Sequence, residues 1–127
     1  MIPAARASRV ILATGGALVA AATVLGALGA HALRLSPDQL RVYETAVRYH
    51  FFHALGLLAI GLLVRAADSA LARFSAGLIV SGIVLFSGSL YALTFGAPRG
   101  IGIVTPIGGV ALIVGWIAFA AAALRAG

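Results

Sequence analysis

The sequence contains no cysteine and no lysine, and charged residues make up only 9% of its 127 residues. Without cysteine, the chain has no disulfide, no thiolate metal site and no thiol nucleophile. Its carboxylates are only Asp38, Glu44 and Asp68, and no hydrolase motif of serine, histidine and acid accompanies them. We therefore expect no enzymatic activity and no catalytic residue.

Hydrophobic residues, in contrast, make up 62% of the chain and give it a mean hydropathy of +1.12, far above that of a soluble domain. A membrane-spanning helix needs about 20 apolar residues. Three runs reach that length, at 10–30, 74–98 and 100–124, and a shorter fourth run, 49–64, can be extended backwards. Because the runs are continuous and not alternating, they predict helices and not barrel strands.

The sequence thus predicts an all-α fold: an integral membrane four-helix bundle, in which an interfacial loop precedes a long second helix. We expect a single transmembrane domain with spans at about 10–30, 45–64, 74–96 and 103–124. The lipid bilayer is then the first partner of the chain.

The net charge of +6 comes from nine arginines, which lie at the ends of the apolar runs and not in one cluster. This distribution is typical of a membrane interface, so we expect no binding to nucleic acid. Four spans put both termini and the hairpin after Val64 on one side, with five arginines against four on the other. This bias predicts cytoplasmic termini.

The segment Ser36-Pro37-Asp38-Gln39 predicts the start of the second helix at Pro37. Ser36 can cap the helix, proline suits the first helical position, and Gln39 completes the spacing of a capping box. A helix from Pro37 to Val64 exceeds the thickness of the hydrocarbon core. We expect its first turns to stand out of the bilayer or to lie along the interface.

Polar residues gather in segment 26–64, which holds all three histidines. Glu44 and Arg48 share one helical face and have the spacing of an ion pair. This face either meets water and headgroups, or brings Glu44, Arg48 and His53 into the mouth of the bundle, where ionisable groups are usually functional. The candidate polar cluster comprises His31, Glu44, Arg48, Tyr49 and His53.

Small residues predict where helices approach closely in lipid. Ala22, Gly26 and Ala30 form such a stripe in the first span. In the third span, we expect Ser81, Gly88 and Tyr91 to face inward. In the fourth, Pro106 begins or kinks a helix, and Gly108 with Gly115 indicates a second contact face.

Four segments, GALGAHAL, YETAVRYHFFHAL, LFSGSLYAL and TPIGG, make the chain resemble a family of small bacterial membrane proteins, domain of unknown function 423. The family is similar to eukaryotic transmembrane protein 256. The resemblance covers nearly the whole chain. It implies a four-helix protein of the bacterial cytoplasmic membrane, without an established activity.

The family pattern falls on all five residues of the polar cluster and on residues that we expect to pack helices together: Gly26, Gly29, Ser87, Gly88, Ser89, Pro106 and Gly108. In that pattern, glutamine is common at the position of His50. The resemblance therefore favours His31 and His53 over His50 as functional histidines.

Cofactor binding has little support in the sequence. His50 and His53 could face one metal ion with His31 or Glu44, but no outer ligand partners are evident, nor is a facing axial pair for haem. We expect no metal and no cofactor.

The predicted function is helix association, as a homo-oligomer or as an accessory subunit of a larger membrane complex. The alternative is a proton, ion or small-solute transport element that uses His31, Glu44 and His53.

Overall fold

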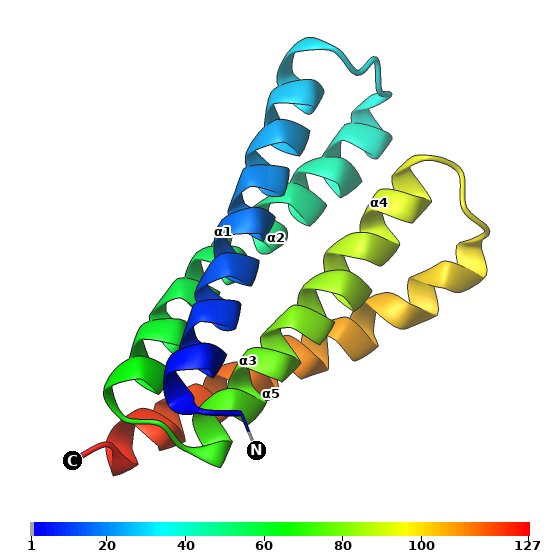
Figure 1. Cartoon of the computed structure of the whole chain (residues 1–127). Helices are drawn as coiled ribbons and strands as arrows, with labels where there is room; N and C mark the ends of the chain where they lie inside the picture. Colours follow the sequence, from blue (N-terminus) through cyan, green and yellow to red (C-terminus); the bar gives the residue numbers. More distant parts are fainter. Residues whose placement is uncertain (1) are drawn as a thin grey trace.

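The computed structural model describes residues 2–127 and contains four long helical segments (Figure 1). The first two are α1 (Ala4–His31) and α2 (Pro37–Ala66). The third runs through α3 (Ala70–Gly82), the π-helical turn η1 (Ile83–Ser87) and α4 (Gly88–Thr94). The fourth joins the 3₁₀ turn η2 (Arg99–Ile103) to α5 (Val104–Arg125).

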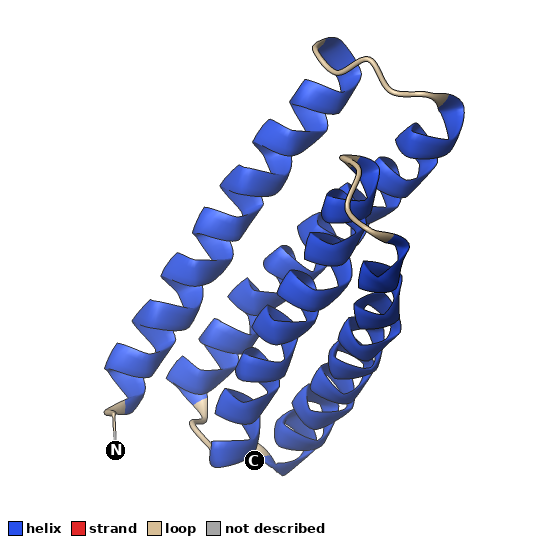
Figure 2. Cartoon of the chain, turned by 90° about the vertical axis from the view of Figure 1, so that its right-hand side faces the viewer, coloured by secondary structure: helices blue, strands red, loops and turns tan. Residues whose placement is uncertain are grey.

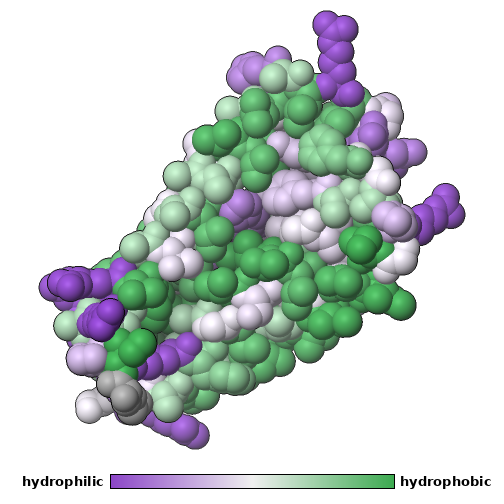
Figure 3. Space-filling model, turned by 45° about the vertical axis from the view of Figure 1, so that its right-hand side comes forward, coloured by the Kyte–Doolittle hydropathy of each residue, from purple (hydrophilic) through white to green (hydrophobic). Residues whose placement is uncertain are grey.

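All four segments are long and apolar enough to cross a membrane. The predicted all-helical fold with four spans is therefore confirmed, with no strand among the described residues. The helices run past the predicted apolar spans, because polar first and last turns continue the same hydrogen-bonding pattern. Figure 3 shows the resulting surface, with hydrophilic side chains gathered at two ends and a largely hydrophobic belt between them.

The start of α2 follows the predicted capping box. The backbone N–H of Gln39 donates to Ser36 Oγ at 3.2 Å, and the backbone N–H of Ser36 donates to Gln39 Oε1 at 3.0 Å. Gln39 Nε2 also donates to the carbonyl of Thr94 at 3.0 Å, which ties this end of α2 to the end of α4. With 30 residues, α2 is about 45 Å long, which exceeds the thickness of the hydrocarbon core of a bilayer.

The bundle consists of two helical hairpins (Figures 1 and 2). One hairpin pairs α1 with α2, and the other pairs the α3–η1–α4 segment with η2 and α5. The long helix α2 joins them, because it contacts α3, η1 and α4 as well as α1. By contrast, α1 packs almost solely against α2 and lies at the outside of the bundle.

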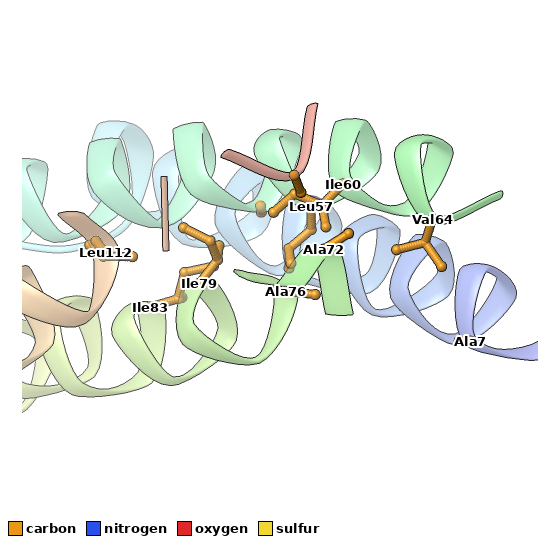
Figure 4. Close-up of a cluster of buried hydrophobic side chains, with 11 residues drawn as sticks. Ala7, Leu57, Ile60, Val64, Ala72, Ala76, Ile79, Ile83 and Leu112 are labelled. Carbon is orange, nitrogen blue, oxygen red and sulfur yellow. The ribbon is translucent and has the colours of Figure 1, made fainter. Parts of the chain in front are cut away.

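The hydrophobic core lies where α2, α3 and α5 meet (Figure 4). Leu57 and Ile60 of α2 pack there with Ile79 of α3 and Leu112 of α5. Close approach of α5 depends on Gly108, whose place for a Cβ atom is already occupied by the backbone of Leu85 and Phe86 in η1. The two helices therefore touch backbone to backbone at this point.

The π-helical turn η1 corrects one prediction. It closes with an i→i+5 hydrogen bond from the Gly88 amide to the Ile83 carbonyl, so it holds one residue more than an α-helical turn. The extra residue rotates the following helix by about 100° relative to a straight helix. Tyr91 accordingly faces the bundle while Ser81, which was expected to share its face, is exposed.

Candidate functional site

The residues of the predicted polar cluster lie in three separate places. His31 is exposed at the last position of α1. Glu44 and Arg48 are exposed on α2 and line one groove, whereas Tyr49 and His53 line a different cavity. Within residues 2–127, no hydrogen bond or ion pair joins Glu44 to Arg48, and none joins either of them to His53.

The groove beside Glu44 and Arg48 runs between the C-terminal half of α1 and the N-terminal half of α2, and its volume is about 610 Å³. One wall contains Gly26 and Gly29 of α1. A side chain at Gly29 would overlap the ring of Tyr43, so the absence of one lets α1 and α2 close over this tyrosine.

Tyr43 is the buried member of an aromatic group that the sequence did not indicate. Its side chain is 1% exposed, and its hydroxyl donates to the backbone carbonyl of Leu25 in α1. The ring lies edge-on to Tyr91, with a centroid distance of 5.8 Å, and to Phe95 at 6.1 Å. Tyr43 thus connects α1, α2 and α4.

His50 is the histidine that lies inside the bundle. It is 5% exposed, and its Nδ1 forms a hydrogen bond of 2.9 Å with the hydroxyl of Tyr91. Its Nε2 is buried without a partner among the described residues. A glutamine, the residue that the family pattern favours, could form a similar bond to Tyr91. The hydrogen bond to Tyr91 alone does not depend on an imidazole, since an amide side chain also has donor and acceptor atoms.

Tyr49 and His53 form a second aromatic group on the opposite flank of α2. Their rings stack with a centroid distance of 5.7 Å. The centroid of the Tyr49 ring lies 4.6 Å from that of Phe86, and the centroid of the His53 ring lies 6.0 Å from that of Trp116. His50 and His53 thus have different neighbours and do not converge. Across the described chain, no group of three or more histidine, aspartate or glutamate side chains is arranged to hold a metal ion.

The predicted packing residues also differ in what they contact. Ser87 donates to the carbonyl of Ala46 in α2 at 2.8 Å, and Ser89 shares a 2.6 Å hydrogen bond with Thr105. Gly88 does not fit the prediction, because a Cβ there would meet no atom within 4 Å. Pro106 lies in the first turn of α5, where proline is tolerated, as expected for a residue that begins a helix, but it is exposed and does not pack against another helix.

Sequence comparison relates the chain to one family. The family described as Protein of unknown function (DUF423) matches residues 25–109. UPF0382 membrane protein SSP2132 of Staphylococcus saprophyticus is 46% identical over 110 residues, which cover 85% of this chain and 89% of the relative. UPF0382 membrane protein YwdK of Bacillus subtilis is 42% identical, covering 91% and 95% of the two chains. UPF0382 inner membrane protein YgdD of Escherichia coli is 35% identical, covering 80% and 79%. No solved structure matches.

Proposed function

Because this chain belongs to the DUF423 family of unknown function, we propose that it acts by helix association in the membrane, with α1 binding a second copy. This role involves no catalysis. The observation that carries it is the outer face of α1. This face exposes mainly small side chains, whereas the outer face of α5 exposes large ones.

The first support is the position of α1 in the bundle. It packs almost solely against α2, and only 11% of the 18-residue apolar stretch of α1 is buried. The corresponding stretches of the other three helical segments are 28–33% buried. A long face of α1 is therefore available to a neighbour in the membrane.

The second support is the composition of that face. Between Val10 and Val24, the exposed residues of α1 are Ala13, Gly16, Ala17, Ala20, Ala21 and Thr23. The outer face of α5 instead exposes large aliphatic side chains such as Val110, Ile113 and Ile117. Large side chains suit contact with acyl chains, whereas small ones let two helix backbones approach closely.

The third support is the absence of a charged group from this part of α1. The exposed residues between Val10 and Val24 carry no charge that would select a partner of complementary charge. A surface of small side chains is self-complementary, which is the requirement for a two-fold symmetric dimer. These features favour a second copy of the chain over a different subunit.

Energy transfer between labelled copies in lipid vesicles tests the proposal. Ala20→Leu adds bulk on the outer face of α1, and we expect it to weaken dimerisation about tenfold or more, since overpacking a contact costs about 1–3 kcal/mol. Gly16→Leu should act likewise, because a Cβ at Gly16 meets no atom of its own protomer within 4 Å. Ala59→Leu on the exposed side of α2 is the matched control.

Equal dimerisation of Ala20→Leu and Ala59→Leu would rule out α1 as the contact. A monomeric chain that comigrates with another membrane protein would instead identify an accessory subunit. The transport alternative has no structural support, because the structure places His31, Glu44 and His53 apart.

We also propose that both termini are cytoplasmic, in the cytoplasmic membrane, which agrees with the name of the Escherichia coli relative. The start of α1, the loop between α2 and α3, and the end of α5 lie together at the end that holds the termini (Figure 1). These segments carry Arg6, Arg9, Arg65, Arg73 and Arg125, which favours this orientation. Since the chain has no cysteine, single cysteines at Ser36 and Gly127 can be labelled with an impermeant maleimide. We expect labelling of intact cells at Ser36 only, and labelling at Gly127 alone would reverse the orientation.

A further inference from the structure

A small cavity lies on the flank of α2 that faces away from α1, between α2, η1 and α5. Its volume is about 300 Å³, which is at the lower end for a small-molecule site. Tyr49, His53, Phe86 and Trp116 form an aromatic wall, and Gly109, Leu112 and Ile113 complete the lining. Ile113 is 62% exposed, so the cavity opens at the outer surface of the bundle.

The depth of the cavity follows from the predicted spans. His53 lies close to the centre of the span at 45–64, and Leu112 lies close to the centre of the span at 103–124. Both residues are thus near the middle of the bilayer, where acyl chains and not water surround the protein. A ligand must therefore be soluble in lipid.

Backbone contacts hold the walls in place. Trp116 rests directly on Gly56, where any side chain would overlap its ring, and it packs edge-on against Phe119 at 5.6 Å. On the other side, the π-helical turn η1 carries Phe86 to within 4.6 Å of Tyr49. Such turns occur frequently at functional sites. The cavity is a formed feature of the fold, flanked by flat aromatic surfaces.

Two of the residues that line the cavity, Tyr49 and His53, carry polar groups. His53 Nδ1 donates to the carbonyl of Tyr49 at 2.6 Å, and since a carbonyl only accepts, Nδ1 carries the proton. In the neutral ring, Nε2 is then an acceptor. Within the described chain, neither His53 Nε2 nor the Tyr49 hydroxyl has a hydrogen-bond partner. Unpaired polar atoms are costly in lipid, where no water can satisfy them.

We infer that this cavity binds a lipid-soluble hydroxylated aromatic ring, of the phenol or quinol class. The ring packs between Phe86 and Trp116, its hydroxyl donates to His53 Nε2, and the Tyr49 hydroxyl donates to an oxygen of the ligand. An acyl chain fills the same volume but pairs neither polar atom. This site is independent of the α1 face that is proposed to form the dimer.

The single tryptophan of the chain, Trp116, reports on binding directly. In lipid vesicles, para-bromophenol should quench its fluorescence saturably, because bromine quenches tryptophan at short range. Bromobenzene, which has the same ring and bromine without a hydroxyl, should quench only in proportion to its concentration. If bromobenzene saturates with equal affinity, the hydroxyl is not recognised and the inference is wrong.

Variants separate the polar contact from the space. His53→Phe keeps an aromatic wall but removes the acceptor, and the half-saturating concentration of para-bromophenol should rise about tenfold, the effect of one hydrogen bond. Gly109 lines the cavity, and a Cβ there would meet its nearest atom at 3.7 Å, so that a side chain fits without a clash. Gly109→Leu should therefore fill the cavity and abolish saturation. Gly77→Leu, at an open position of α3, should bind like the wild type. Unchanged binding by both His53→Phe and Gly109→Leu would overturn the inference.

Discussion

At the scale of single residues, two kinds of contact hold the bundle together. One is direct contact between backbones, as where α5 meets η1 at Gly108. The other is a buried hydrogen bond between helices, as between His50 and Tyr91. In lipid, both supply a larger share of the free energy of helix association than in water, because helices there gain no hydrophobic free energy from associating.

Replacement of Gly108 by alanine should destabilise the bundle. The added Cβ would overlap backbone atoms of Phe86, which cannot rotate away as a side chain can. We expect a loss of about 1–3 kcal/mol, measured by thermal unfolding in detergent with circular dichroism. Gly88→Ala, at a position that is open around the Cβ, should be neutral or slightly stabilising. Equal stability of the two variants would contradict the contact.

Removal of the Tyr91 hydroxyl should also be costly. In Tyr91→Phe, both ring nitrogens of His50 would be buried without partners, and we expect a loss of about 1–3 kcal/mol in the free energy of unfolding. In a His50→Leu background, the same change should cost much less, since the hydroxyl has no partner left to lose. A double-mutant cycle measures this coupling, and additive effects would show that the hydrogen bond contributes nothing.

At the scale of helices, the sequence predicted the long α2 and its capping box because helix starts depend on local residue order. It did not predict η1, since no residue type specifies an extra residue in a turn. The contacts of Tyr43 with α1 and α4 were missed for a related reason. They depend on how helices distant in the sequence are arranged, and aromatic residues occur throughout apolar spans. The hypothesis that Glu44, Arg48 and His53 meet at the mouth of the bundle depended on how the helices pack, and the structure places them on two flanks of α2.

The loop between α2 and α3 predicts a pH effect. Two hydrogen bonds from Arg73, at 2.8 and 2.6 Å, hold the pKa of the Asp68 carboxyl below its usual value. A lowered pKa in the folded state stabilises the fold above about pH 4, and this contribution disappears as the pH falls through the folded pKa. The unfolding temperature should therefore decrease more between about pH 6 and about pH 3 in the wild type than in Asp68→Asn. Parallel decreases in both proteins would exclude this ion pair as the cause.

At the scale of the whole molecule, the bundle is unevenly held together. The long helix α2 contacts both hairpins, whereas α1 is attached along one face only. A helix with few contacts opens at a lower free energy than a central one. The hairpin of α1 and α2 thus has a stable inner member and a less stable outer member.

Hydrogen exchange should reveal this difference. In dilute detergent solution, where copies are separated, we expect amides of α1 to exchange faster than those of α2, α3 and α5 at equal depth in the bundle. At high protein density in vesicles, dimerisation through α1 should slow its exchange selectively. Uniform protection of all four helical segments in dilute solution would contradict the peripheral position of α1. Mass spectrometry of proteolytic fragments gives the required resolution.

Because of the π-helical turn η1, the contact between Tyr91 and His50 depends on the number of residues in the third span. Deleting the exposed Val84 would restore ordinary α-helical winding and turn everything after it by about 100°. Tyr91 would then swing away from His50, although no contacting side chain had been altered. An insertion elsewhere in a straight span would have the mirror effect. The bundle therefore tolerates exchanges of side chains at many outward positions more readily than the gain or loss of a single residue in its third span.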